Sequence, residues 1–220
     1  MADAWQGPSW GPAAGGAPRK LVLLLHGLGA DGFDLIDLAP GWGRAVPEAL
    51  FLAPHAPEPC DLAPHGRQWF SLADRTPARV LAGVRVAADA LGARIDAELA
   101  RHGLRDGDMA LMGFSQGAMT ALFTALRRRA TPACVLAFSG ALPGAELPAA
   151  EVTARPPVLL VHGEADEVVP PARGREAESA LRAMGVEVEA AYRPGLGHGI
   201  DEVGVSLGAL TLQRHLGAGR

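Results

Sequence analysis

The stretch MALMGFSQGAM, residues 109–119, contains the pattern that decides the fold. It begins as a continuous apolar run, breaks at the Gly-Phe-Ser-Gln-Gly of residues 113–117, and continues into a helical pattern over residues 116–129. An apolar run without polar alternation is typical of a strand buried on both faces, as in a parallel sheet covered by helices. The stretch therefore predicts a buried strand, a sharp turn and a helix in direct succession.

The same pattern recurs along the chain. Short apolar runs that stop at Gly, Pro or Ser are KLVLLLHG (20–27), ALFLAPHAP (49–57), ACVLAFSG (133–140) and PPVLLVHG (156–163). In VEVEAAYRP (186–194), apolar and polar residues alternate instead, which favours a strand nearer a sheet edge. An apolar stripe at steps of three and four predicts a helix over 77–101, and we also expect helices over 171–184 and 205–216. Strands that alternate with helices indicate an α/β fold, with a mostly parallel central sheet and helices on both faces.

Length and composition suggest one domain. The 220 residues are enough for one sizeable core; we expect a single domain over 20–220 after an irregular Gly/Pro-rich arm over 1–19. Two cysteines form no disulfide framework, and we expect Cys60 exposed in a loop and Cys134 buried in a strand. The net charge of −4 without a single-signed run argues against a nucleic-acid partner. No membrane span and no secretory signal are evident, so the expected location is the cytoplasm.

Ser115 is the candidate nucleophile. The motif G-x-S-x-G between a strand and a helix is the nucleophile elbow, a strained turn in which Gly113 and Gly117 avoid Cβ clashes. The backbone N–H groups at the start of the helix favour negative charge near the serine oxygen. Ser139 also follows a strand and a Phe, but only Gly140 adjoins it and the elbow spacing is missing.

A serine hydroxyl needs a base, and the α/β-hydrolase chain order is serine, acid, histidine. His198 in PGLGHGI follows the final strand, between two glycines that free the backbone to turn the imidazole inward. The acid should follow an earlier strand, where VHGEADEVVP offers Asp166 and, as its main competitor, Glu164. We favour Asp166, a short carboxylate followed by apolar residues that can exclude water; it would hold the imidazole tautomer.

The glycine-rich turn HGLGADG, residues 26–32, has two interpretations. Its G-x-G-x-x-G matches the dinucleotide fingerprint, but the next strand ends in FLAPHAP without the ribose-binding carboxylate. The alternative is an oxyanion hole, with backbone N–H groups from Leu28 and from Gln116, the residue after the nucleophile. In that case the backbone of Gln116 matters and its side-chain amide does not. The loop HAPEPCDLAPH has irregular spacing and many prolines, which argues against a metal site.

Taken together, LLLHGLGADGFDL, GRQWFSL, MGFSQGAM, VHGEADEVVP and GLGHGI resemble the phospholipase/carboxylesterase family of α/β-hydrolases, small serine esterases related to acyl-protein thioesterases. The resemblance implies an α/β-hydrolase fold without a large cap domain. It places the nucleophile, acid and base on Ser115, Asp166 and His198, and the oxyanion donors on Leu28 and Gln116. The Trp69-Phe70 pair matches the family's pair near the acyl site, although Ser71 stands where the family usually has Asp.

We therefore predict a carboxylesterase that hydrolyses short to medium acyl esters through an acyl-serine intermediate, without a cofactor or metal. Its substrate would be a small-molecule ester in an open cleft, and a homodimer is left open. The predicted cleft-lining residues, besides Leu28, are Trp69, Phe70, Leu72 and Val169. An acyl-protein thioesterase or lysophospholipase would use the same site. From another class, a nucleotide-binding or non-catalytic binding module is the alternative.

Overall fold

The computed structural model describes residues 6–144 and 151–217. Its centre is a seven-stranded sheet in the order β1-β3-β2-β6-β7-β8-β9. The strands are β1 (Ser9–Trp10), β2 (Lys20–Leu25), β3 (Ala49–Leu52), β6 (Met109–Phe114), β7 (Cys134–Phe138), β8 (Val158–Gly163) and β9 (Val188–Arg193). Every neighbouring pair is parallel except β1 with β3. The mostly parallel sheet is confirmed, and the alternating strand β9 lies at its edge, as predicted.

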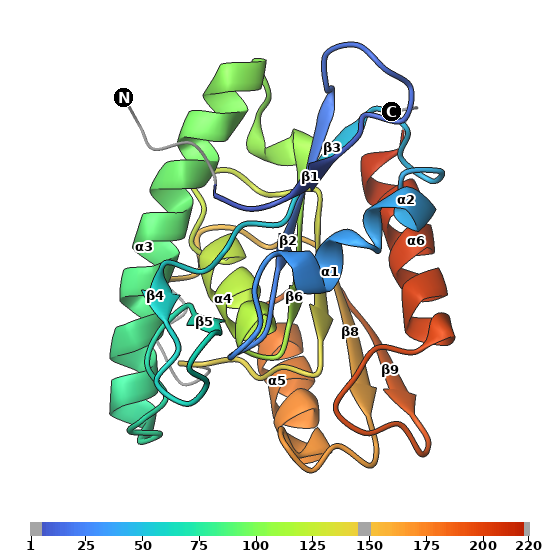
Figure 1. Ribbon diagram of the computed structural model, residues 1–220. Coiled ribbons are helices and arrows are strands. Elements are labelled where there is room, and N and C mark those ends of the chain that lie inside the picture. The colour runs from blue at the N-terminus through green and yellow to red at the C-terminus, as the bar shows by residue number, and fades with distance from the viewer. Residues whose placement is uncertain (1–5, 145–150, 218–220) are drawn as a thin grey trace.

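Helices cover both faces of the sheet (Figure 1). One face packs against α3 (Pro77–His102), α4 (Gln116–Ala125) and α5 (Pro171–Ala183); the other packs against α1 (Phe33–Ile36), α2 (Ala39–Trp42) and α6 (Glu202–Leu216). Side chains of β2 alternate between the two cores: Leu21, Leu23 and Leu25 enter the first, while Val22 and Leu24 enter the second. This two-sided burial explains why the strand reads as an uninterrupted apolar run.

Two helices differ in extent from the prediction because of specific hydrogen bonds. Helix α6 begins at Glu202 rather than 205, since the Asp201 carboxylate accepts a hydrogen bond from Gly204 N at 2.8 Å and caps the helix. Helix α4 ends at Ala125 rather than 129. The carbonyl of Leu126 accepts from the backbone N–H groups of Thr153 and Ala154, so the chain is held by a neighbouring segment instead of a further helical turn.

The N-terminal arm is not wholly irregular, which corrects the prediction for the part of 1–19 that the structure describes. Ser9 and Trp10 form β1, which adds an antiparallel strand beside β3, and the ring of Trp10 contacts Phe51 edge-on at 5.9 Å. The prediction for Cys60 was also wrong. Cys60 is buried and unpaired, like Cys134, because the loop folds back on itself: Cys60 N donates to the carbonyl of Gly66 at 2.9 Å, and the sulfur accepts from Leu62 N at 3.4 Å.

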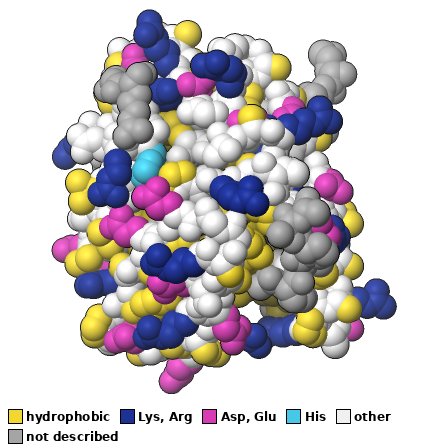
Figure 2. All heavy atoms as spheres, turned by 180° about the vertical axis from the view of Figure 1, so that it is seen from behind, with side chains coloured by type: hydrophobic (Ala, Val, Ile, Leu, Met, Phe, Trp, Pro, Cys, Tyr) yellow, Lys and Arg dark blue, Asp and Glu magenta, His cyan; other side chains and the backbone are white. Residues whose placement is uncertain are grey.

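The carboxyl ends of the parallel strands share one edge of the sheet, at the bottom of Figure 1, where the arrowheads of β8 and β9 point. The connection between β3 and α3 crosses this region and contains the two-residue strands β4 (Glu58–Pro59) and β5 (Arg67–Gln68), which pair antiparallel. Within residues 6–144 and 151–217, no helix is long and apolar enough to cross a membrane. On the face shown in Figure 2, acidic and basic side chains are interspersed.

Candidate active site

Ser115 occupies a strained turn between β6 and α4. Its φ and ψ of 53° and −116° lie in a region that residues with a side chain rarely adopt. The two flanking glycines are sterically required. A Cβ on Gly113 would lie 2.3 Å from the carbonyl carbon of Gly117, and a Cβ on Gly117 would lie 1.9 Å from the carbonyl oxygen of Leu25. The G-x-S-x-G spacing thus follows from backbone packing, and the turn has the form of a nucleophile elbow.

The loops after β8 and β9 bring Asp166 and His198 together. His198 Nδ1 lies 2.7 Å from Asp166 Oδ2. The other oxygen, Oδ1, accepts from the backbone N–H groups of Val168 and Val169 at 2.9 and 2.8 Å. The competitor Glu164 instead forms an exposed ion pair with Arg175 at 3.2 Å. Of the two candidate acids, Asp166 is therefore the one that contacts the histidine.

The Asp166 carboxylate is held in its ionised form although its side chain is 0% exposed. Burial alone would raise its pKa, but the hydrogen bond from His198 and those from Val169 and Val168 outweigh burial and lower the pKa below its ordinary value. An ionised carboxylate can only accept hydrogen bonds, so His198 donates its Nδ1–H. The neutral imidazole then has Nε2 available as a base.

Ser115 and His198 line the same cleft, which has a volume of about 700 Å³. Phe114 packs beside the imidazole, with ring centroids 4.8 Å apart. Within the described residues, Ser115 Oγ makes no hydrogen bond to His198; such contacts often tighten only when substrate binds. Of the residues predicted to line the cleft, Leu28, Leu72 and Val169 do so.

Trp69 and Phe70 lie behind the cleft wall rather than on its surface. Their exposed fractions are 5% and 2%, and neither lines the cleft. The amide of Gln116 holds them in place: its oxygen accepts from Trp69 N at 2.9 Å, and its nitrogen donates to the carbonyl of Phe70 at 2.6 Å. The sequence analysis assigned importance only to the backbone of Gln116 and missed this contact, because no local pattern links residues 47 positions apart.

The backbone N–H groups of Leu28 and Gln116 both belong to residues that line the cleft. Within the described residues, neither N–H has a hydrogen-bond acceptor in the protein, which leaves both available to an oxyanion. His26 fixes the turn that carries Leu28. Its Nδ1 donates to the carbonyl of Gly27 at 2.7 Å, and its Nε2 accepts from Ala56 N at 3.0 Å. This pair of bonds requires the neutral ring, and burial lowers the pKa of His26 accordingly.

His162, at the end of β8, contacts the loop that carries Asp166. Its Nε2 lies 2.8 Å from the carbonyl of Val169 and 3.4 Å from Asp166 Oδ2. Its side chain is 3% exposed, and a Cβ on Gly174 of α5 would lie 2.6 Å from its Nδ1. Helix α5 therefore packs directly over the ring and holds it against the loop.

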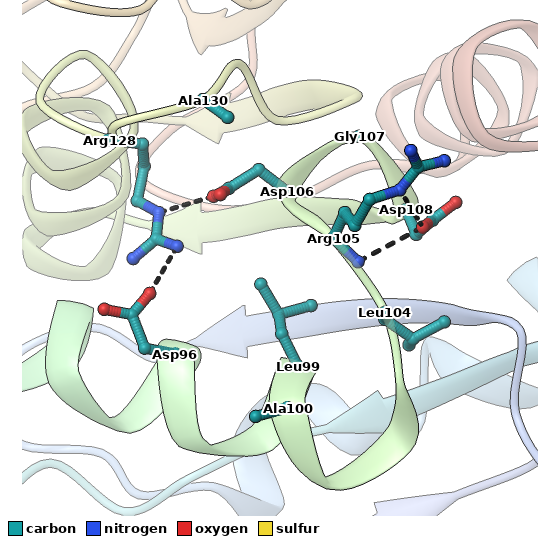
Figure 3. Close-up of a pocket in the computed structure, with 10 residues that line it drawn as sticks. All are labelled: Asp96, Leu99, Ala100, Leu104, Arg105, Asp106, Gly107, Asp108, Arg128 and Ala130. Carbon is teal, nitrogen blue, oxygen red and sulfur yellow. Dashed lines mark hydrogen bonds and ion pairs between the residues drawn. The ribbon is translucent and has the colours of Figure 1, made fainter.

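A second hollow, of about 630 Å³, lies at the opposite end of the sheet, where the 3₁₀ helix η1 (Asp106–Asp108) leads into β6. Figure 3 shows Arg128 between two carboxylates, with Nη2 2.6 Å from Asp96 and Nε 2.5 Å from Asp106. These bonds tie α3 to the start of β6. The charges are satisfied within the protein, and the hollow lies away from Ser115.

Comparison with known proteins identifies the family. The family model described as phospholipase/carboxylesterase matches residues 13–215. The chain belongs to this family. The crystal structure of esterase PE8 superimposes with a TM-score of 0.91 at 39% identity, covering 96% of this chain and 99% of the other. Family and structure together make the protein an α/β-hydrolase that acts on esters.

Two relatives show how activities vary within the family. A protein of Oryza sativa subsp. japonica described as a probable inactive carboxylesterase is 32% identical over 203 residues, which are 86% of this chain and 82% of the relative. Acyl-protein thioesterase 1 of Neurospora crassa is 28% identical over 198 residues, which are 80% and 79% of the two chains. The arrangement around Ser115 therefore has to be judged on its own geometry.

Proposed function

We propose that the protein is a serine carboxylesterase that hydrolyses short to medium acyl esters through an acyl-serine intermediate. The observation that carries the proposal is the convergence of three loops on one cleft. Ser115 stands on a strained turn after β6, and His198 shares that cleft while its Nδ1 is held 2.7 Å from a buried, ionised Asp166. Each group has the surroundings that its role requires.

In the proposed reaction, His198 Nε2 takes the proton from Ser115 as Oγ bonds to the ester carbonyl carbon. The tetrahedral oxyanion accepts hydrogen bonds from Leu28 N and Gln116 N, each worth about 3 kcal/mol of barrier. His198 then protonates the leaving alcohol, and water, activated by the same imidazole, releases the acid and restores the serine. Asp166 stays ionised and stabilises the imidazolium.

The shape of the cleft supports a short to medium acyl group. Leu72 and Val169 contribute apolar wall, and the described residues insert no cap domain above Ser115. Trp69 and Phe70 shape this wall from behind through the Gln116 amide. The nucleotide-binding alternative is less favoured, because the helix after the glycine-rich turn, α1, has only four residues.

A fluorophosphonate probe tests the proposal directly. The intact protein should be labelled at Ser115 and should hydrolyse 4-nitrophenyl butyrate; Ser115→Ala should lose both properties. Labelling that survives in Ser115→Ala would refute the assignment of the nucleophile. A properly folded wild type that neither reacts with the probe nor hydrolyses any ester would place this chain with the inactive relative.

A thioesterase is the second candidate, supported by the similarity to the Neurospora protein. Esters and thioesters use the same nucleophile and oxyanion donors, so turnover of a matched pair with identical acyl groups separates the two activities. A lysophospholipid belongs in the same panel. We retain the cytoplasm as the expected location; both cysteines are unpaired.

A further inference from the structure

A second cavity adjoins the active-site cleft. This cavity, of about 310 Å³, lies between the start of α3, the start of α5 and the segment after β7, which the structure describes as far as Gly144. The cleft and the cavity share five lining residues: Arg75, Val80, Met119, Ala141 and Arg173. Neither Ser115 nor His198 lines the second cavity. We take the cleft and the cavity to be one passage that starts at Ser115, so a group bound in the cavity would lie beyond the reacting carbonyl.

The shared residues are of two kinds. Val80, Met119 and Ala141 present an apolar surface that suits a methylene chain. Arg75 and Arg173, the two cationic residues among the five, line both spaces. An acyl chain that followed the apolar surface away from Ser115 would pass these two cations.

The two cations are weakly neutralised. Within residues 6–144 and 151–217, Arg75 has no carboxylate within ion-pair distance. Arg173 pairs only with Glu176 at 2.8 Å, an exposed i,i+3 contact of the kind that contributes little. Among the residues that the structure describes, the carboxylates that line the two spaces are Asp34 in the cleft and Glu176 in the cavity, and Glu176 is already engaged by Arg173.

The helices beside the cavity add to the positive potential. Helices α3 and α5 both begin there, with Pro77 and Arg173 among the lining residues, and neither has an acidic residue in its first turn. A helix N-terminus carries a partial positive charge and usually attracts acidic side chains. Arg173 lies in the first turn of α5, where its positive charge is next to the positive end of the helix. A bound anion would offset this repulsion.

We propose that this passage selects esters whose acyl chain ends in a carboxylate, with Arg75 and Arg173 binding that carboxylate as specificity-determining residues. The inference rests on the proposed esterase function and adds a substrate class to it, the monoesters of aliphatic dicarboxylic acids. Ser115 Oγ would bond to the ester carbonyl, the alcohol would leave with a proton from His198, and water would release the dicarboxylic acid. Charge-assisted hydrogen bonds from guanidinium to carboxylate supply the recognition.

The test compares kcat/KM for mono-(4-nitrophenyl) adipate with that for its neutral analogue, methyl 4-nitrophenyl adipate. We expect the wild type to prefer the anionic ester. The ratio of the two values should fall about threefold in Arg75→Gln or Arg173→Gln and about tenfold in the double variant. Arg75→Lys should retain most of the preference. The preference should also shrink at high salt, since both guanidinium groups are exposed.

Matched controls remove the same charge without touching the passage. Arg79→Gln is two residues after Pro77 on α3, and Arg175→Gln is two residues after Arg173 on α5; neither side chain lines either space. Both controls should keep the wild-type ratio. A fall in the controls as large as in Arg75→Gln would mean a general charge effect and would overturn the proposal.

The placement of the anion is tested separately with 4-nitrophenyl hexanoate and 3-carboxy-4-nitrophenyl hexanoate, which carries its carboxylate on the leaving group. If the arginine variants lower the rate only for this second ester, the cations face the leaving group and the proposal is wrong. An unchanged adipate ratio in the double variant also overturns it. Failure to hydrolyse even the neutral esters would instead contradict the proposed esterase function.

Discussion

Ser115 and Ser139 directly follow two neighbouring strands, β6 and β7, and yet have different surroundings. Each follows a phenylalanine, the two phenylalanines are paired in register between β6 and β7, and the φ angles are 53° and 48°. Ser115 opens onto the cleft and directly precedes α4, whereas Ser139 is 0% exposed and its hydroxyl is buried without a partner among the described residues. Backbone strain after a strand is therefore common to both serines; access to the cleft, a following helix and a nearby histidine are what set the proposed nucleophile apart.

The largest predicted difference between the two serines is in turnover. Ser115→Ala should lower kcat at least about 10⁴-fold, because the acyl-enzyme cannot form. Ser139→Ala should stay within about twofold of wild type, since that hydroxyl touches no reacting group. Hydrolysis of 4-nitrophenyl butyrate measures both. An equal loss of kcat in the two variants would contradict the predicted difference between the two serines.

The residues that follow the two serines also differ: Gln116 anchors Trp69 and Phe70, whereas Gly140 has no side chain. Gln116→Ala keeps its backbone N–H but releases the cleft wall, so kcat/KM should fall roughly tenfold or more through misplacement of the substrate. Thr124→Ala, in the same helix, removes a buried hydroxyl that has no partner among the described residues and should not change activity. Wild-type kinetics in Gln116→Ala would mean that the backbone alone matters.

The turn at Ser115 packs against Gly27, next to the buried neutral His26. The stability of the protein should therefore depend on the pH at which His26 gains a proton. Burial lowers the pKa of His26 from 6.5, so the unfolded chain binds the proton more readily than the native one. This contribution to stability is fully present above pH 6.5 and is lost as the pH falls through 6.5 toward the lowered pKa.

Thermal unfolding from pH 8 to pH 5 checks this dependence. His26→Asn should lower the melting temperature most at high pH, and the difference from wild type should narrow as the pH falls. His65→Asn, an exposed histidine, serves as the control. A difference that does not change with pH would contradict the prediction.

The smallest predicted effect concerns the stability of the Ser139 turn. An unpartnered buried hydroxyl costs free energy, so Ser139→Ala should raise the free energy of unfolding by about 1 kcal/mol. Denaturant titration measures the change. A clear loss of stability would show that the hydroxyl is hydrogen-bonded in solution, for example to a water molecule.

Local pattern was enough to predict the parallel sheet, the helices α3, α4, α5 and α6, and the contact between Asp166 and His198. The apolar runs mark strands buried on two faces, and residues at their carboxyl ends must meet at one edge of a parallel sheet. The pattern could not show that Trp69 and Phe70 face inward, because the Gln116 amide that turns them joins segments far apart in sequence. The short strand β1 was missed for a similar reason: its pairing with β3 depends on backbone hydrogen bonds rather than on an apolar repeat.

The connection between β3 and α3 attaches to the elbow by a few defined bonds. Besides those to the Gln116 amide, the indole of Trp69 donates to the carbonyl of His26 at 2.9 Å. Two further anchors hold the glycine-rich turn: Arg67 of β5 exchanges backbone hydrogen bonds with Gly29 and Ala30 at 2.9 Å, and Ala56 N donates to His26 Nε2 at 3.0 Å. The connection can therefore be exchanged only between its anchors: a graft that keeps the backbone positions of Ala56, Arg67, Trp69 and Phe70 could change the cleft wall while leaving Ser115, Asp166 and His198 in place.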